Sequence, residues 1–258
     1  MSILRKIMAE RRNAVEELKR GNPVEKLKEQ ASQRPPKKSL AGRLLTAGTN
    51  VVAEIKKASP SAGLLRGDCD PGSVSAVYAA NGAVGISVLT EPGYFGGCKQ
   101  DLLDVKGAVD LPVLRKDFIC DAWQVFETAA WGADVLLLII AGLDSHLLVE
   151  LYHQSIECGL DVLAEAHTEE EAETALGLEK CIVGVNSRNL DTLETDLETA
   201  RKVSSMIPQD RVSIAESGIK CREDIVELQE RGYNGFLVGE LLMKADDPGS
   251  ELRALRGS

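Results

Sequence analysis

Residues 135–140 read Val-Leu-Leu-Leu-Ile-Ile, an unbroken run of aliphatic side chains. A strand with one face in water alternates apolar and polar residues, whereas a strand buried on both faces does not. The run is also far too short to span a bilayer, so no membrane association is expected from it. The stretch therefore predicts a strand of a parallel sheet that helices cover on both faces.

The same kind of run recurs between residues 51 and 239. Seven further runs, rich in β-branched residues, lie at 51–56, 85–90, 112–117, 162–166, 181–186, 212–217 and 235–239. Helical segments separate the runs, and four of these segments end at a glycine: 121–132, 144–159, 168–177 and 223–232. Parallel strands need such crossover helices. Eight βα units in succession predict a closed (β/α)8 TIM barrel of the α/β class. A doubly wound open sheet is the alternative, although it usually has fewer strands.

The first fifty residues do not follow this pattern. Residues 3–19 place apolar side chains on one face of a helix: Ile3, Leu4, Ile7, Met8, Val15 and Leu18. Pro23 can begin a second helix that runs to about Gln30, and Pro35-Pro36 then interrupts the chain. We therefore expect an N-terminal helical extension at residues 1–45 that packs on the active face of a catalytic barrel at residues 46–258.

Charge is divided unevenly along the chain. The 258 residues carry a formal net charge of −10, but residues 1–50 hold 12 Lys and Arg against 5 Asp and Glu, a net +7. Residues 51–258 hold the other 18 basic and 35 acidic residues, a net −17. The acidic total argues against a general nucleic-acid-binding protein. We expect the basic extension to dock near the mouth of the barrel and to add to the positive field there.

Six cysteines are scattered through the chain without a Cys-x-x-Cys pair: Cys69, Cys98, Cys120, Cys158, Cys181 and Cys221. We expect free thiols in a reducing cytoplasm rather than disulfides or a cysteine metal site. The first twenty residues lack the continuous apolar segment of a signal peptide. Neither a dinucleotide-binding fingerprint nor metal-ligand spacing is found, so no cofactor and no metal are expected.

Charged and polar residues follow the apolar runs, where the loops of a barrel build its active face. They lie at the ends of the first, third, fifth, sixth and seventh predicted strands: Glu54 and Lys56, Lys116, Glu165, Asn186 and Arg188, Glu216 and Ser217. Side chains alternate along a strand, so Glu54 and Lys56 share a face. Together these residues predict one shared site at the mouth of the barrel.

Several of these residues also have a simpler interpretation. Lys56 precedes Lys57 and could be a solvated lysine, and Lys116 could belong to a surface ion-pair cluster with Arg115 and Asp117. Glu165 is harder to explain in this way. It lies between two alanines in an apolar strand, where a carboxylate is costly to bury unless it is paired or used.

Two loops with glycine suggest a bound phosphate. Ser217-Gly218-Ile219 follows the seventh predicted strand, and Val238-Gly239-Glu240 follows the eighth. Glycine lets the backbone approach an anion closely, and backbone N–H groups can surround it. The loops after the last two strands are a frequent phosphate site in such barrels. The Glu240 side chain would repel a phosphate, so we expect it to point away.

The sequence resembles the indole-3-glycerol phosphate synthase family. The resemblance runs in order from about Leu4 to Met243 and is carried by six stretches: Ala53-Glu-Ile-Lys-Lys-Ala-Ser-Pro-Ser61, Ser87-Val-Leu-Thr-Glu91, Pro112-Val-Leu-Arg-Lys-Asp-Phe118, Gly184-Val-Asn-Ser-Arg-Asn-Leu190, Glu216-Ser-Gly-Ile219 and Leu237-Val-Gly-Glu-Leu-Leu-Met243. It implies a phosphate-binding barrel that closes the indole ring of 1-(2-carboxyphenylamino)-1-deoxyribulose 5-phosphate, with loss of carbon dioxide and water, in tryptophan biosynthesis. Other enzymes of that pathway would then be possible partners.

The resemblance also implies roles for the catalytic residues. Lys116 is the general acid that protonates the ribulose carbonyl, and Glu165 is the acid/base partner in the dehydration. Lys56 holds the substrate carboxylate, and the division of proton transfer between Lys56 and Lys116 stays open. The remaining implied catalytic positions are Glu54 and Asn186, which position sugar hydroxyls and the lysines, and Ser217 at the mouth.

Substrate-binding roles follow in the same way. The phosphate is assigned to Ser59, Gly218, Gly239 and Glu240. Glu216 is assigned to substrate binding and lines the mouth of the barrel. Arg188 orients the loop after the sixth strand. The aryl group is assigned to a pocket of Phe95, Phe118 and Leu137, although such residues are more often ordinary core.

The chain departs from the family pattern at two places. Glu165 lies between alanines where valine is more usual, which we interpret as a packing change. Ala62 stands where many relatives place a lysine, so loop closure and turnover could differ. Two other functions stay open: another sugar-phosphate isomerase or epimerase of this fold, and a non-catalytic phosphate-binding barrel. Neither needs Glu54, Lys56, Lys116, Glu165 and Asn186 together.

Overall fold

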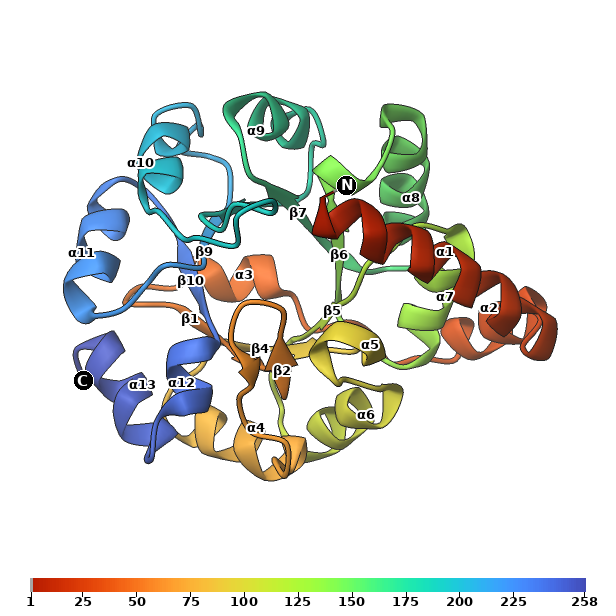
Figure 1. Ribbon diagram of the computed structural model, residues 1–258, viewed down its shortest axis with the longest axis horizontal. Helices are drawn as coiled ribbons and strands as arrows, with labels where there is room; N and C mark the ends of the chain where they lie inside the picture. Colours follow the sequence, from red (N-terminus) through yellow and green to blue (C-terminus); the bar gives the residue numbers. More distant parts are fainter. Residues whose placement is uncertain (1) are drawn as a thin grey trace.

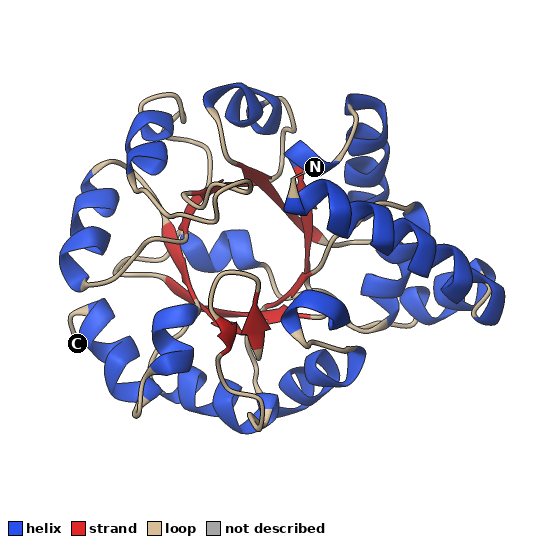
Figure 2. Ribbon diagram, in the orientation of Figure 1, coloured by secondary structure: helices blue, strands red, loops and turns tan. Residues whose placement is uncertain are grey.

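Eight parallel strands close into a barrel in the computed structural model, which describes residues 2–258 (Figure 1). The predicted TIM barrel is confirmed, because each strand pairs with two parallel neighbours and the last strand pairs with the first. The ring of strands is visible at the centre of Figure 2. The barrel strands are Val51–Ile55 (β1), Gly85–Leu89 (β4), Val113–Lys116 (β5), Val135–Ile139 (β6), Asp161–Ala166 (β7), Ile182–Asn186 (β8), Ser213–Glu216 (β9) and Gly235–Val238 (β10).

Helices surround the barrel and extend from its N-terminus. Those of the extension are Ile3–Gly21 (α1), Val24–Ser32 (α2) and Leu40–Leu44 (α3). The others are Pro71–Ala80 (α4), Pro92–Phe95 (α5), Lys99–Ala108 (α6), Ala122–Ala130 (α7), Ser145–Glu157 (α8), Glu169–Leu176 (α9), Glu198–Ser204 (α10), Arg222–Glu230 (α11), Glu240–Lys244 (α12) and Pro248–Arg256 (α13), with a 3-10 turn at Ile140–Gly142 (η1). No described helix is long and apolar enough to cross a membrane.

Side-chain caps explain where several of these helices begin. The Asp144 carboxylate accepts a hydrogen bond from the backbone N–H of Leu147 at the start of α8, and the Thr168 hydroxyl accepts one from Glu171 at the start of α9. Asp121 caps α7 in the same way. Such caps satisfy N–H groups that have no partner within the helix.

The strands alternate between two apolar cores. Ile55 on β1 belongs to the core between the barrel and its helices, whereas Val52 belongs to the core inside the barrel. The inner core also contains apolar residues of the extension, among them Leu4, Leu27 and Leu44. The extension and the barrel therefore fold around a shared core.

The extension lies at both ends of the barrel. α1 crosses the end where the strands finish, and α3 is seen through the ring at the opposite end (Figure 1). Gly235 at the start of β10 makes room for α3, since an added Cβ there would lie 2.3 Å from Cδ2 of Leu44. The expectation that residues 1–45 pack on the active face is therefore wrong for α3, because Leu40 and Leu44 fill the apolar opening where the strands begin.

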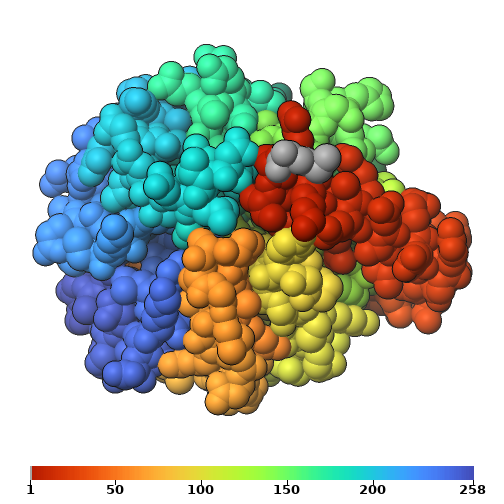
Figure 3. Space-filling model, viewed as in Figure 1, coloured from red at the N-terminus to blue at the C-terminus, as the bar shows by residue number. Residues whose placement is uncertain are grey.

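A short hairpin follows β1 and was not anticipated. Ala58–Ser59 (β2) pairs with Gly63–Leu64 (β3), and the turn between them holds Ala62. This hairpin, α1 and the segment after β8 meet over the mouth of the barrel (Figure 3). They surround the opening through which a ligand would enter.

Candidate active site

A cavity of about 400 Å³ opens at the mouth of the barrel. Every residue proposed for the site from the sequence lines this cavity: Glu54, Lys56, Ser59, Phe95, Lys116, Phe118, Leu137, Glu165, Asn186, Arg188, Glu216, Ser217, Gly218, Gly239 and Glu240. The structure thus brings together residues that are separated by up to 186 positions in the chain, because the strand ends meet at one edge of the barrel.

Lys116 lies among three carboxylates. Its Nζ donates a hydrogen bond to Oε2 of Glu165 at 2.9 Å and also contacts Oε2 of Glu216. Burial alone would lower the pKa of Lys116, but attraction to Glu165, Glu216 and Glu54 outweighs burial and raises it above its usual value. Lys116 is therefore held as an ammonium group in the unliganded protein.

The two glutamates on Lys116 differ in their affinity for a proton. Burial tends to raise the pKa of both, but Lys116 and a neighbouring histidine hold the pKa of Glu165 well below its usual range. For Glu216, burial and repulsion from Glu165 outweigh the attraction of Lys116 and raise the pKa. One carboxylate and one carboxylic acid beside one ammonium group can both donate and accept protons.

Glu54 and Lys56 point into the mouth together, as their alternation predicts. Nζ of Lys56 lies 2.8 Å from Oε1 of Glu54, and both side chains are largely buried. Gly239 allows this arrangement, because an added Cβ there would lie 2.5 Å from the same Glu54 oxygen. Lys57 instead pairs with Asp101, at 2.7 Å from Oδ1. The solvated-lysine interpretation therefore fits neither lysine.

The interpretation of Lys116 as part of a surface cluster is also wrong. Arg115 and Asp117 are fully buried and pair with each other on the outer side of β5, at 3.0 Å. Lys116 faces the barrel interior instead, because successive side chains of a strand point to opposite faces.

His167 is a residue of this cluster that sequence reasoning missed. Its Nε2 lies 3.3 Å from Oε1 of Glu165, and its Nδ1 lies 3.3 Å from Oε2 of Glu171. It follows Glu165 by two positions and comes directly after the last residue of β7, so alternation continued beyond the strand places both on the same side. That spacing was the signal that could have identified it.

The glycine loops lie side by side, because β9 and β10 are neighbours in the barrel. Ser217 has a φ of 64° and Gly218 a φ of 81°, so the chain turns sharply after β9. A positive φ is uncommon for serine and marks a strained position. Ser59 completes this side of the cavity, and its Oγ accepts a hydrogen bond from the N–H of Ala62 at 3.2 Å.

Arg188 and Glu240 connect the loops after β8 and β10. Nη2 of Arg188 lies 3.4 Å from Oε2 of Glu240, and Nζ of Lys244 lies 2.7 Å from Oε1. The hydrogen bond from Lys244 is the main cause of a lowered pKa of Glu240. The Glu240 charge thus lies between two cations, and Glu240 is one of the residues that line the cavity. Asn186 accepts a hydrogen bond from the N–H of Arg188 at 3.0 Å.

The opposite side of the cavity is apolar. The rings of Phe95 and Phe118 lie 6.0 Å apart between centroids, and Leu137 lines the cavity beside them. The extension contributes three further apolar residues that were not assigned to the site: Ile3, Leu4 and Ile7. Their positions on the apolar face of residues 3–19 were the signal, once that helix was expected over the mouth.

Comparison with known proteins decides the family. The family model described as indole-3-glycerol phosphate synthase matches residues 4–255. The chain belongs to the indole-3-glycerol phosphate synthase family. An indole-3-glycerol phosphate synthase from Burkholderia multivorans is 44% identical over 253 residues, which cover 97% of each chain. One from Burkholderia vietnamiensis is 43% identical with the same coverage.

Solved structures that resemble the chain extend the fold but not the family. A thiamine phosphate pyrophosphorylase from Pyrococcus furiosus has a TM-score of 0.60 and 18% identity, with 85% of this chain and 96% of that chain covered. A structure described as native KDPGal has a TM-score of 0.58 and 13% identity, with coverage of 81% and 94%. At such identities the likeness concerns the barrel alone. Family membership, by contrast, does not favour an isomerase, an epimerase or a non-catalytic barrel.

Proposed function

We propose that this chain closes the indole ring of 1-(2-carboxyphenylamino)-1-deoxyribulose 5-phosphate to form indole-3-glycerol phosphate, with release of carbon dioxide and water, in tryptophan biosynthesis. Membership of a family of carboxy-lyases with this activity supports the reaction. The observation that supports the residue roles best is the position of Lys116, between Glu165 and Glu216 and in the same cavity as Phe118.

In the first step, Lys116 is the general acid. The aryl carbon that bears the carboxylate attacks the ribulose carbonyl, a carbon–carbon bond forms, and the ammonium group gives its proton to the carbonyl oxygen, which becomes a hydroxyl group. The carboxylate then leaves as carbon dioxide. The surrounding acidic side chains keep Lys116 protonated until the substrate arrives, and a positioned acid typically contributes about 10²- to 10⁴-fold to the rate.

In the second step, the new hydroxyl group leaves as water. Glu165 acts as the acid/base partner. Its ionised carboxylate accepts the proton that the methylene carbon next to the ring nitrogen loses, and it gives a proton to the hydroxyl group as the carbon–oxygen bond breaks and water leaves. Glu216, which retains a proton more readily, lies across Lys116 from it. Its Oε1 is buried and has no hydrogen-bond partner among residues 2–258.

The two ends of the cavity match the two ends of the substrate. Phe95, Phe118 and Leu137 receive the aryl group, and Lys56 holds its carboxylate. Ser59 and the loops at Gly218 and Gly239 hold the phosphate, with Arg188 balancing the charge of Glu240 beside them. Glu54 and Asn186 position Lys56 and the sugar hydroxyls, and Ser217 lines the turn after β9. Fixing both anionic ends would hold the reacting carbons together.

The decisive experiment is an assay of the purified protein with this substrate, followed by indole fluorescence. We expect product formation, and at least a hundredfold slower turnover for Lys116→Ala, of the order given by loss of a general acid. Lys202→Ala, at an exposed position of α10, is the matched control and should keep full activity. No product from the wild-type protein would refute the activity, and full activity of Lys116→Ala would refute the role of that lysine.

We also propose where the enzyme works and with which other enzymes it associates. The phosphate-bearing substrate is a small molecule, and the six cysteines are free thiols, as suits a cytoplasmic enzyme. Association with other enzymes of tryptophan biosynthesis would bring this enzyme close to those that supply its substrate and use its product. Co-purification of the tagged protein from its own cells, with and without a crosslinker, tests that association, and recovery of the protein alone would argue against it.

A further inference from the structure

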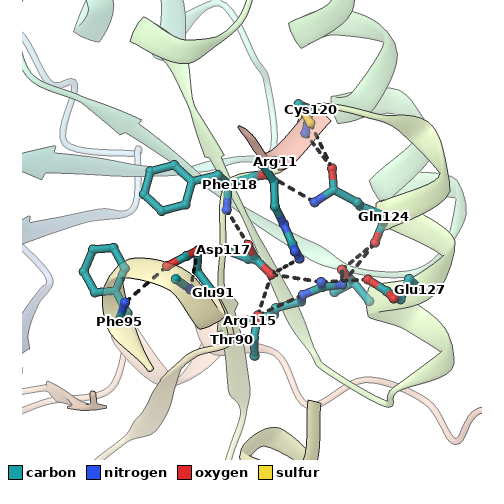
Figure 4. Close-up of polar contacts among 12 residues, drawn as sticks. Arg11, Thr90, Glu91, Phe95, Arg115, Asp117, Phe118, Cys120, Gln124 and Glu127 are labelled. Atoms are coloured by element: carbon teal, nitrogen blue, oxygen red, sulfur yellow. Dashed lines mark hydrogen bonds and ion pairs between the residues drawn. The ribbon is translucent and has the colours of Figure 1, made fainter. Parts of the chain in front are cut away.

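A buried ion pair joins the N-terminal extension to the strand that carries Lys116. Arg11 of α1 is 8% exposed, and its Nη2 donates a hydrogen bond to Oδ2 of Asp117 at 2.7 Å (Figure 4). The Asp117 side chain is fully buried. A long polar side chain is seldom enclosed in this way unless its partner is precisely placed, because both charges lose their hydration.

Asp117 collects four hydrogen bonds, from three different parts of the chain. Its Oδ2 also accepts from Oγ1 of Thr90 at 2.7 Å and from Nη2 of Arg115 at 3.0 Å, and its Oδ1 accepts from the N–H of Phe118 at 2.8 Å. Burial would raise the pKa of Asp117, but Arg115 and Arg11 outweigh it and lower the pKa. Asp117 is therefore an anion that depends on both arginines.

The buried charges balance only when Arg11 is present. Arg115 also pairs with Glu127 at 2.7 Å, so two arginines face two carboxylates in this network. Without Arg11, one guanidinium group would be left to neutralise both acids. A buried carboxylate that loses a partner is strongly destabilised, and the local structure relaxes to reach water or another donor.

This network holds segments of the chain that line the catalytic cavity. Asp117 lies directly between Lys116 and Phe118, and its Oδ1 fixes the backbone of Phe118. Thr90 precedes Glu91, whose carboxylate accepts hydrogen bonds from three backbone N–H groups at the start of α5, including that of Phe95 at 3.2 Å. The network thus connects α1 to Phe118 and, through Thr90 and Glu91, to Phe95 (Figure 4). Lys116 directly precedes Asp117 in the chain.

We propose that Arg11 is a positioning residue for ring closure. It acts through Asp117 to hold Lys116 and Phe118 in their positions relative to the other residues of the cavity. Catalysis then requires that the N-terminal helix is docked on the barrel, and the helix does more than cover the mouth. The inference rests on the proposed role of Lys116. A displacement of about 1 Å at a reacting group is enough to lower a rate about a hundredfold.

The test compares Arg11→Met, which keeps an unbranched apolar stem without the charged guanidinium group, with Lys19→Met. Lys19 is on the same helix and makes a more exposed ion pair with Asp121, 2.5 Å away, outside the Asp117 network; the two side chains are 32% and 29% exposed. We expect Arg11→Met to lower kcat about 10- to 100-fold, whereas Lys19→Met should stay within about twofold of the wild type in kcat. KM for the substrate should change less than kcat in both variants.

Tryptophan fluorescence shows whether the extension stays docked in each variant. Nε1 of Trp123 donates a hydrogen bond to the carbonyl of Asn22 at the end of α1, at 2.9 Å. An unchanged emission maximum with a lowered kcat would support positioning. If Arg11→Met does not fold, Arg11→Lys keeps the charge and should show an intermediate kcat, because ammonium lacks the planar geometry of guanidinium.

The outcomes distinguish failure of the proposed function from failure of the positioning role of Arg11. Wild-type protein without product formation would overturn the proposed function itself. Wild-type kcat in docked Arg11→Met or in Arg11→Lys would overturn the positioning role while leaving the function intact. Equal losses of kcat in Arg11→Met and Lys19→Met, in proportion to their loss of stability, would reduce Arg11 to a structural anchor and also overturn the proposal.

Discussion

His167 makes the charge state beside the site depend on pH. Burial lowers the pKa of this imidazole, but its contacts with Glu165 and Glu171 outweigh burial and raise the pKa to about 9. An unfolded histidine has a pKa of about 6.5. The protonated ring therefore stabilises the fold fully below about pH 6.5, and this stabilisation is lost as the pH rises through about 9.

We predict that His167→Gln lowers the free energy of unfolding by on the order of 3 kcal/mol at pH 6 and by much less at pH 10. Urea unfolding at both pH values measures the difference. The control is His153→Gln, at an exposed position of α8, which should follow the wild type at both pH values. A gap between wild type and His167→Gln that does not narrow with rising pH would show that the ring is not held protonated.

Residues whose chemistry conflicts with their surroundings could be predicted from the sequence. Glu165 interrupts an apolar strand, so its presence demanded a partner or a function, and it lines the predicted cavity. Asp117 and Arg115 gave no such signal, because an Arg-Lys-Asp stretch looks like an exposed charged turn. Only the closed barrel, which buries Arg115 completely, shows that the outer side of this strand end is an internal ion-pair network.

At the scale of elements, α3 closes the end of the barrel where the strands begin. Leu40 and Leu44 are each 1% exposed, whereas the next residue, Leu45, is 66% exposed. We predict that Leu44→Ala lowers the free energy of unfolding by about 2 to 5 kcal/mol, as expected for a cavity in a packed core. Leu45→Ala is the matched control and should change it by less than about 0.5 kcal/mol.

The same variants separate stability from catalysis. α3 lies at the opposite end of the barrel from Lys116, so kcat of Leu44→Ala should equal that of the wild type at a temperature where both are folded. Urea unfolding and the indole fluorescence assay measure the two properties on one preparation. A lowered kcat in folded Leu44→Ala would mean that the two ends of the barrel are coupled, contrary to this division.

Element prediction succeeded where the periodicity was long or unbroken. The eight barrel strands were identified because predominantly apolar runs rich in β-branched residues recur along the chain, and α8 and α9 because their caps are visible in the sequence. α3 and the β2–β3 hairpin could not be identified in this way. α3 has five residues and each hairpin strand two, which is too few to show a period, and α3 is held by contacts with strands far along the chain.

At the scale of the whole molecule, the basic extension neutralises part of the charge of the acidic barrel. Five basic residues of the extension pair with barrel aspartates: Arg11 with Asp117, Lys19 with Asp121, Arg34 with Asp134, Lys37 with Asp161, and Lys38 with Asp110. The expected contribution of the extension to a positive field at the mouth is therefore reduced. Its charges hold it in place, and its apolar residues complete the cavity.

This division can be tested without deleting the extension, which would expose buried barrel residues such as Trp123. Arg5 and Lys6 are exposed on α1, near the residues that line the cavity. Charges in water are screened over about 8 Å at physiological salt, so Arg5→Gln/Lys6→Gln should raise KM by less than about twofold. Leu4→Ala/Ile7→Ala removes part of the apolar wall of the cavity and should raise KM several-fold, since each lost methylene of contact contributes about 0.8 kcal/mol. If the field were dominant instead, the charge variant would show the larger rise in KM, and that rise would grow as the salt concentration falls.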